Sequence, residues 1–387
     1  MPLYLCVDCG GSKTSVVLTD RTGNPVARAL GGPSNFAYLG LAPFIAVVQE
    51  SVEKALRACD PDILDAELHK DGAAPTGRAL TLPPPENHPF FAAAWLGVSG
   101  CDSPAAIATL TPPLEKLLGI RPRVANDTHL LAAPMKLYPE VNGAIAAVAG
   151  TGGIVVSFGD AVKSASGGDV VGLEELGRVG GWGWILGDEG GGFHVGREAI
   201  RQVLEQADRA SVKKKPEVNE AGDVTKIWGL KERLLHRFQV TDVFELLTVV
   251  HLPDPAHGSS LDTTPNVGPD YVLMPREKRL SSLSPLVFTA AFEDHDPLAL
   301  NVLKTTSGAL VDQICILLKG ENEITEDRTI RASDSILCLG GSLSGLDTYR
   351  GLLLDELKRR GHVFCRVEVI DDAAAVGAKA LAVSTGP

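Results

Sequence analysis

The chain has 387 residues, of which 44% are hydrophobic and 22% are charged, so it can bury more than one core and two domains are expected. Its formal net charge of -12 argues against a basic surface that would bind nucleic acid or an anionic membrane. A small molecule is therefore the expected kind of substrate.

The N-terminal segment alternates short apolar runs with turn residues. The runs at 3–7, 14–19 and 25–29 have the composition of strands, and glycine or polar residues at 9–13 and 21–24 separate them. This pattern predicts a three-stranded meander that opens a domain.

A similar pattern recurs at residues 143–162. An apolar run at 144–148 leads into a glycine turn at 150–153, a second run follows at 154–158, and a turn is expected at 159–160. Because the arrangement occurs twice, we expect the chain to contain one fold twice, as two α/β lobes that face one cleft.

Further helices and strands are expected around the two meanders. Helices at 41–59 and 191–210 follow the first and the second meander, and Ser103 with Pro104 starts another helix that extends to residue 110. The remaining expected elements are strands at 92–98, 124–126 and 334–339 and helices at 130–138, 347–360 and 371–383. Three stretches rich in proline, glycine or charge are interpreted as surface insertions: 65–89, 211–226 and 251–285.

The first glycine turn is a candidate phosphate site, because glycines let backbone N–H groups approach a phosphate and hydroxyl groups add donors. Asp8 precedes the turn, and a carboxylate beside phosphates is suited to hold Mg²⁺ through the ion's waters. The turn leads into a strand, whereas a P-loop or a dinucleotide fingerprint opens a helix, so neither motif applies. The alternative is a tight hairpin turn without a ligand. The candidate phosphate contacts are Gly10, Gly11, Ser12, Lys13 and Thr14.

The glycine turn of the second meander repeats this arrangement. The candidate contacts there are Thr151, Gly152 and Gly153. Two such turns that face each other would hold the β- and γ-phosphates of a nucleotide from both sides. The pair of turns therefore points to a nucleotide more strongly than either turn does alone.

Asp127 follows the strand expected at 124–126 and precedes a helix, so it stands at the carboxyl edge of a strand, where α/β proteins usually place their sites. One interpretation is an aspartate that caps the helix. The other is a general base that orients and deprotonates an acceptor hydroxyl as it attacks a γ-phosphoryl group.

The segment at 180–192 combines many glycines with two tryptophans. Glycines bring the backbone close to a ligand, an indole can form a pocket wall, and Asp188 can accept hydrogen bonds from sugar hydroxyls. Alternatively, Asp188 only favours the positive end of the following helix. Asn35 could present its amide to a hydroxyl or be an ordinary turn residue. The candidate sugar contacts are Asn35, Asp127, Gly181, Trp182, Gly183 and Asp188.

In their order along the chain, these motifs resemble those of the eukaryotic N-acetylglucosamine kinases, in the BadF/BadG-type branch of the sugar kinase, heat-shock ATPase and actin superfamily. The resemblance covers nearly the whole chain apart from the three insertions. It implies two actin-like (ribonuclease H-like) α/β lobes with a central cleft that binds ATP and Mg²⁺. It also implies that Asp127 is the base for the 6-hydroxyl of N-acetylglucosamine.

The resemblance further implies domain limits and nucleotide contacts. Residues 1–136, completed by 371–387, would form the N-terminal lobe, and residues 137–370 the C-terminal lobe. An adenosine motif at 339–345 would contribute Gly340, Gly341, Ser342 and Gly345. Other acceptors stay open, namely glucosamine, N-acetylmannosamine and glucose. An activator-type ATPase that acts on a protein partner also stays open, although the cysteines lack a cluster-ligating arrangement.

Seven cysteines are scattered along the chain without the pairs of a zinc site, and we expect them to be reduced thiols. The N-terminus runs directly into a strand, with no basic leader and no apolar stretch long enough to span a bilayer. A cytoplasmic location is expected, with a sugar and ATP as partners and with no nucleic acid or membrane. Whether the chain forms a homodimer is left open.

Overall fold

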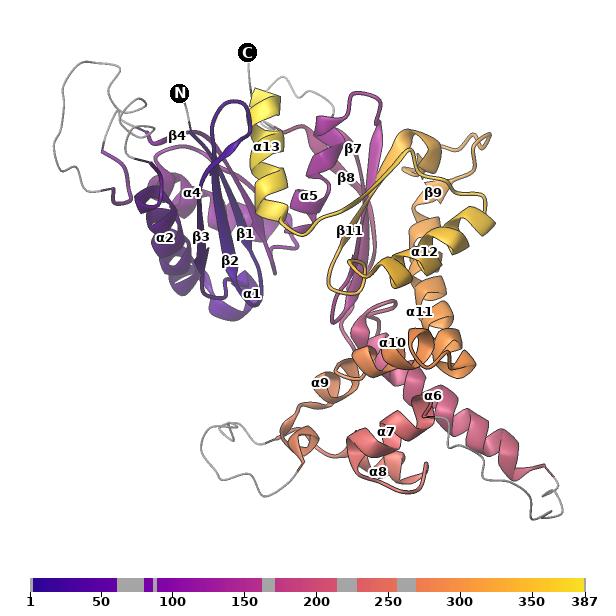
Figure 1. Ribbon diagram of the computed structural model, residues 1–387. Coiled ribbons are helices and arrows are strands. Elements are labelled where there is room, and N and C mark those ends of the chain that lie inside the picture. Colours follow the sequence, from indigo (N-terminus) through magenta and orange to yellow (C-terminus); the bar gives the residue numbers. More distant parts are fainter. Residues whose placement is uncertain are drawn as a thin grey trace.

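The computed structural model describes residues 3–60, 80–85, 89–161, 171–213, 228–255 and 269–385. Its two large sheets have five strands each, and in Figure 1 they lie side by side with the C-terminal helix between them. Each sheet joins an antiparallel three-stranded meander to two parallel strands. The two sheets therefore share one topology, as the repeated sequence pattern predicts.

The first sheet has the strand order β3, β2, β1, β4, β5. Its strands are β1 (Leu3–Cys9), β2 (Thr14–Thr19), β3 (Pro25–Gly31), β4 (Phe91–Val98) and β5 (Arg123–Ala125). The expected first meander and the strands expected at 92–98 and 124–126 are confirmed to within two residues.

Helices cover both faces of the first sheet. On one face lie α2 (Leu41–Arg57) and α4 (Pro104–Leu118), whose apolar side chains join those of β1 and β4 in one buried cluster. The other face carries α13 (Ala373–Thr385), whose small residues allow a close approach. A Cβ atom at Gly377 would lie 2.7 Å from the Cys6 sulfur. The C-terminal helix thus packs on the first sheet although it follows the second sheet in sequence.

The second sheet has the strand order β12, β11, β6, β7, β8. Its strands are β6 (Gly143–Ala149), β7 (Gly153–Asp160), β8 (Leu173–Gly180), β11 (Ser335–Gly340) and β12 (Arg366–Val369). The turn expected at 159–160 is wrong, because Gly159 and Asp160 pair with β8 and continue strand β7.

The second lobe has more helices than the first. In Figure 1, α11 and α12 lie beside the second sheet, and α6 to α10 extend below it. These helices are α6 (Gly192–Ser211), α7 (Leu230–Phe238), α8 (Glu245–His251), α9 (Arg276–Ser281), α10 (Ser284–Phe292), α11 (Pro297–Ile316) and α12 (Asp347–Arg359). The short elements are α1 (Phe36–Leu39), η2 (Asp270–Leu273), η3 (Ala332–Asp334), β9 (Leu318–Lys319) and β10 (Ile330–Arg331). Across the described ranges, none of the helices has both the length and the apolar character needed to cross a bilayer.

The single helix expected at 130–138 is wrong. The chain forms α5 (Thr128–Leu131) and then the 3₁₀ helix η1 (Ala133–Leu137). Pro134 explains the break, because it has no N–H to donate to the carbonyl four residues before it.

The insertion expected at 251–285 is wrong for its described C-terminal part. Residues 270–285 form η2, α9 and the start of α10, and Tyr271 and Leu283 belong to the main buried cluster of the second lobe. Residues 256–268 lie outside the described residues, as do most of the expected insertions 65–89 and 211–226.

Arg279 shows how a segment rich in charge is buried. Its side chain is 1% exposed, and its guanidinium donates to five backbone carbonyl groups. The acceptors are the carbonyls of Tyr271, Val249, Leu252, Pro253 and Met274, at 2.8 to 3.5 Å. One side chain therefore joins several turns, and it is the donor for the carbonyls of Leu252, Pro253 and Met274, while those of Val249 and Tyr271 also accept a backbone N–H.

Arg279→Met is expected to lower the free energy of unfolding by about 2–3 kcal/mol, because it leaves the carbonyls of Leu252, Pro253 and Met274 without their donor. The measurement is denaturant unfolding. The matched control is Arg276→Met, which removes an exposed ion pair with Asp254 and is expected to change stability by less than about 0.5 kcal/mol. Equal effects of the two substitutions would contradict the role given to Arg279.

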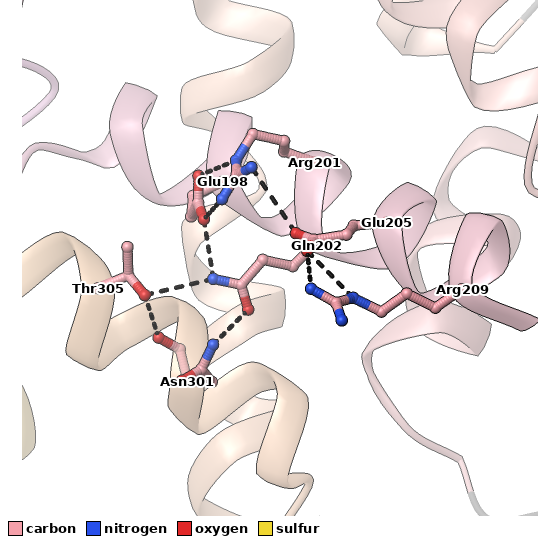
Figure 2. Close-up of polar contacts among 7 residues, drawn as sticks. All are labelled: Glu198, Arg201, Gln202, Glu205, Arg209, Asn301 and Thr305. Carbon is pink, nitrogen blue, oxygen red and sulfur yellow. Dashed lines mark hydrogen bonds and ion pairs between the residues drawn. The ribbon is translucent and has the colours of Figure 1, made fainter.

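A polar contact zone joins α6 to α11 (Figure 2). The Gln202 amide donates to Glu198 at 2.8 Å and to Thr305 at 3.3 Å, and it accepts from Asn301 at 2.9 Å. Arg201 pairs with the buried Glu198 at 2.7 Å, so the charge of this carboxylate is compensated. These bonds fix the orientation of α6, which matters because the first residues of α6 support the candidate site described next.

Candidate functional site

The first glycine turn joins β1 to β2. It is closed by the Gly10 N–H, which donates to the Lys13 carbonyl at 3.0 Å, and residues 11–13 are exposed. Thr14 is buried beneath the turn, and its hydroxyl lies 2.6 Å from both the Gly32 carbonyl and the Ser34 hydroxyl. The turn thus offers exposed donors, whereas the Thr14 side chain supports it from below.

Asp8 is the penultimate residue of β1. Burial, together with the charges of Asp127 and Asp372, raises the pKa of Asp8 to about 7, although Lys13 opposes the shift. Asp8 also lines a cavity of about 530 Å³ whose charged residues are Asp8, Lys13, Arg28, Lys54, Asp371 and Asp372.

A divalent cation fits this donor set, since it would offset the repulsion between Asp8 and its acidic neighbours. Among the described residues, however, no three or more His, Cys, Asp or Glu side chains come together as a complete metal site. Phosphate oxygens and water would have to supply the remaining ligands, as is usual for Mg²⁺.

Asp127 follows β5 and precedes α5. Burial raises the pKa of its carboxyl and the charge of Asp102 adds to the shift, while hydrogen bonds from the Thr128 N–H and the Ser99 hydroxyl oppose it. Asp127 stands at the N-cap position of α5, but apart from this contact with the adjacent Thr128 N–H its side chain makes no capping hydrogen bond to the helix. Instead, Asn126 accepts from the Thr128 N–H at 3.0 Å and from the Thr128 hydroxyl at 2.7 Å. The helix-capping interpretation of Asp127 is therefore not supported.

Asn35 is brought close to Asp127 through Ser99. Its amide donates to the Ser99 hydroxyl oxygen at 3.0 Å, and the same hydroxyl hydrogen-bonds to Asp127. The Asn35 carbonyl oxygen accepts from the Tyr38 N–H, so Asn35 also caps α1. Asn35 therefore fills a turn role and is joined through Ser99 to the partly buried carboxylate of Asp127 at the same time. Ser99 was not among the site residues expected from the sequence, because only the fold shows that it lies between these two side chains.

The second glycine turn is held by the start of α6. The N–H groups of Gly192 and Phe193 donate to the carbonyls of Gly150 and Thr151 at 2.8 and 3.0 Å. A Cβ atom at Gly191 would lie 2.6 Å from backbone atoms of Gly152. The turn and the helix therefore form one closely packed unit.

Asp188 lies against this second turn. Its carboxylate accepts from the Gly153 N–H at 3.3 Å, and a Cβ atom at Gly152 would lie 2.4 Å from its Oδ1 atom. Its backbone has a φ of 67°, which is unusual for a residue with a side chain. Burial raises the pKa of Asp188, and the Gly153 N–H opposes the shift. Asp188 thus contacts the turn directly, which the simple helix-dipole interpretation did not include.

Two buried side chains fix the loop that carries Asp188. His194 accepts from the Gly190 N–H at 3.1 Å through Nδ1, and the Tyr349 hydroxyl donates to the Gly190 carbonyl at 2.8 Å. Sequence reasoning missed both residues, since each looks like an ordinary helix residue until the fold brings it to the loop.

The glycine and tryptophan loop follows β8. Gly181 and Gly183 have φ values of 71° and 76°, and the Gly181 N–H donates to the Gly153 carbonyl at 3.0 Å. Trp182 is 63% exposed, whereas the Trp184 ring packs edge-on against Phe193 at 5.4 Å. The loop therefore presents one free indole beside the second glycine turn.

The third glycine segment, which is the expected adenosine motif at 339–345, also packs on the second glycine turn. A Cβ atom at Gly341, whose φ is 90°, would lie 2.5 Å from the Ala149 backbone, and the Leu343 N–H donates to the Ala149 carbonyl at 2.9 Å. Ser342 and Gly345 are exposed on the same segment. The fold therefore gathers the candidate residues of the second lobe at the ends of β6, β8 and β11.

The sequence profile of the BadF/BadG/BcrA/BcrD ATPase family matches residues 5–382. The chain is similar to a curated N-acetyl-D-glucosamine kinase of Dictyostelium discoideum, with 24% identity over 319 residues, which are 82% of this chain and 79% of that protein. It is also similar to an N-acetylmuramic acid/N-acetylglucosamine kinase of Clostridium acetobutylicum, with 26% identity over 215 residues, 55% of this chain and 57% of that protein.

Two solved structures have a similar fold. One comes from Porphyromonas gingivalis, with a TM-score of 0.57, 18% identity and coverage of 97% of this chain and 98% of that chain. The other comes from Chromobacterium violaceum, with a TM-score of 0.53, 19% identity and coverage of 99% of each chain. Both are assigned only provisionally as N-acetylglucosamine kinases. The expected fold of two actin-like lobes is confirmed. Because the family profile spans nearly the whole sequence, the chain belongs to the BadF/BadG/BcrA/BcrD ATPase family.

Proposed function

We propose that this protein is an ATP-dependent sugar kinase that phosphorylates the 6-hydroxyl of N-acetylglucosamine. The observation that carries the proposal is the Asp127 carboxylate, which is partly buried at the carboxyl end of β5 and joined through Ser99 to the Asn35 amide. The relatives from D. discoideum and C. acetobutylicum are both named as kinases of this sugar, which supports the same acceptor.

In the proposed reaction, Asp127 takes the proton of the 6-hydroxyl while the hydroxyl oxygen attacks the γ-phosphorus. The bond from that phosphorus to the bridging oxygen breaks, and ADP leaves. Phosphoryl transfer of this kind depends mainly on positioning and on stabilisation of charge. A raised pKa suits a general base, because a group that titrates closer to the working pH accepts a proton more readily.

The sugar is proposed to lie between Asn35 and the loop after β8. The exposed Trp182 indole can cover one face of the ring, and the backbone of Gly181 and Gly183 can approach its hydroxyls. Asp188 would accept from a sugar hydroxyl while it contacts the second glycine turn. It would thereby join the sugar site to the phosphate site.

ATP is proposed to bind along the three glycine segments. The proposed contacts are Gly10, Gly11, Ser12, Lys13, Thr151, Gly152, Gly153, Gly340, Gly341, Ser342 and Gly345, with Thr14 supporting the first turn from below. Asp8 would hold Mg²⁺ through water, and the bound ion supplies positive charge that stabilises the phosphates.

We also propose the domain limits expected from the sequence, with residues 1–136 and 371–387 in one lobe and 137–370 in the other. The packing of α13 on β1 and β2 supports this division. The cytoplasmic location stays a prediction, and the oligomeric state stays open.

The acceptor is tested by measuring ADP formation with a panel of sugars. The panel contains N-acetylglucosamine, glucosamine, N-acetylmannosamine, glucose and N-acetylmuramic acid, the last because a relative's name includes it. The highest kcat/KM is expected with N-acetylglucosamine. A higher kcat/KM with another sugar would make that sugar the acceptor, and the protein would still be a sugar kinase. ATP hydrolysis that no sugar changes would contradict the kinase and favour an ATPase that acts on a protein partner.

Gly11→Ala tests the first glycine turn. A Cβ atom at Gly11 meets no protein atom within 4 Å, so the fold itself has room for it. If a phosphate approaches this backbone, the methyl group would weaken its contact, and the KM for ATP is expected to rise about tenfold, the equivalent of one charge-assisted hydrogen bond. The thermal midpoint should not change.

The matched control for Gly11→Ala is Gly32→Ala, because a Cβ atom at Gly32 also meets no atom within 4 Å. We expect this control to leave both the KM for ATP and the thermal midpoint unchanged. Equal KM values for the two variants would argue against a phosphate at the first turn.

A further inference from the structure

An ion pair crosses from one lobe to the other beside Asp127. The Arg178 guanidinium, on β8 of the second sheet, donates to Asp102 Oδ1 at 2.9 Å. Asp102 lies in the loop after β4 of the first sheet. Apart from the effect of the Asp102 charge on the pKa of Asp127, none of the roles proposed above involves this pair.

On the first lobe, the pair is linked to the segment that carries Asp127. The same Asp102 Oδ1 atom accepts from the Asn126 amide at 2.9 Å. The Asn126 carbonyl oxygen in turn accepts from the backbone and the hydroxyl of Thr128. Asp127 lies between these two residues, so a shift of Asp102 would be passed to the backbone on both sides of it.

On the second lobe, the guanidinium touches the loop proposed to bind the sugar. A Cβ atom at Gly181 would lie 3.2 Å from Arg178 Nη2. The Gly181 N–H also donates to the Gly153 carbonyl of the second glycine turn. Arg178 therefore contacts the one loop that borders both the proposed sugar and the proposed phosphate.

The pair has little value for folding stability. The Arg178 and Asp102 side chains are 33% and 49% exposed, and ion pairs at such positions contribute little. The effect of the pair on the reaction rate is expected to be larger, because a displacement of about 1 Å between reacting groups can cost about 100-fold in rate.

We propose that Arg178 and Asp102 are positioning residues that set the separation between the base segment at Asp127 and the sugar loop at Gly181. Neither touches the reacting atoms. This inference rests on the proposed function, because it assigns the pair to the same sugar site.

A double-mutant cycle tests the pair, with Arg178→Gln, Asp102→Asn and the combined variant. Each single change is expected to lower kcat by about 10- to 100-fold, with the KM for the sugar within about threefold of wild type. The combined variant should be no slower than the slower single variant, because each change breaks the same contact. Arg178→Lys keeps a cation in reach and should recover most of kcat.

Controls separate positioning from other causes. Arg237, on the distant helix α7, forms a comparable ion pair with Asp270. Arg237→Gln breaks this pair and should leave kcat unchanged. Thermal unfolding checks that every variant is folded, and Arg178→Met, which also removes the charge of the pair, is used for the comparison if Arg178→Gln does not fold.

Losses that multiply in the combined variant would overturn the proposal, because Arg178 would then act through something other than Asp102. A single variant with wild-type kcat would overturn it as well. A wild-type protein that phosphorylates no sugar would contradict the proposed function before any variant is made, so the two failures can be told apart.

Discussion

Asp127→Asn is expected to lower the rate of sugar phosphorylation by about 10²- to 10⁴-fold, the usual contribution of a general base. Asparagine has nearly the same shape but cannot take the acceptor proton. Binding of ATP and of the sugar should stay within a few-fold of wild type, because the substitution keeps the volume and the hydrogen bond from Ser99. Turnover is measured as ADP formation, and binding by calorimetry.

The control for Asp127→Asn is Asp160→Asn, at the exposed end of β7. It removes an equal charge from the second lobe, away from Ser99 and Asn35, and should leave the rate unchanged. Turnover of Asp127→Asn within twofold of wild type would remove this residue from its proposed role. A loss of sugar binding as large as the loss of rate would make Asp127 a binding residue and not a base.

Most strands of the two sheets could be predicted from the sequence, because they are short apolar runs, several of them bounded by glycine turns. Strands β8 and β12 were missed, because charged residues interrupt both of them. The signal failed where local composition competed with long-range packing. Residues 270–285 look like a surface insertion, yet Tyr271, Arg279 and Leu283 are buried, and Arg279 joins the segment to the carbonyls of distant turns. Residues 159–160 look like a turn, yet pairing with β8 extends the strand through them.

The candidate site was predictable in part, for a similar reason. Glycine turns and an aspartate after a strand are local patterns, and the fold places Asp127 and Asn35 on one hydroxyl, that of Ser99. The roles of Ser99, Tyr349 and Arg178 depend on contacts between segments far apart in sequence, which the spacing of residues does not reveal. Thr14 belongs to the phosphate motif by position, but the fold buries its hydroxyl under the turn.

Asp8→Asn is expected to stabilise the ligand-free protein at pH 8 by about 1–3 kcal/mol while it lowers the rate of phosphorylation by about 100-fold or more. Burial and the charge of Asp127 raise the pKa of Asp8 to about 7, well above the value of about 3.9 expected in the unfolded chain. The folded protein therefore holds a proton that the unfolded chain releases. The stability that this provides is lost as the pH rises from about 4 through 7, and asparagine avoids the loss.

Asp20→Asn is the matched control for Asp8→Asn, and its effect on the free energy of unfolding is expected to have the opposite sign. Asp20 accepts from the Thr22 N–H and hydroxyl and from the Asn24 N–H, and these bonds lower its pKa. Its contribution is therefore present above the unfolded pKa and lost as the pH falls, so Asp20→Asn should destabilise at pH 8 by less than about 1 kcal/mol. Denaturant unfolding between pH 4 and 8 measures both variants. If Asp8→Asn changed stability equally at pH 4 and pH 8, folding would not raise the pKa of Asp8, and a bound cation would have no such strain to relieve.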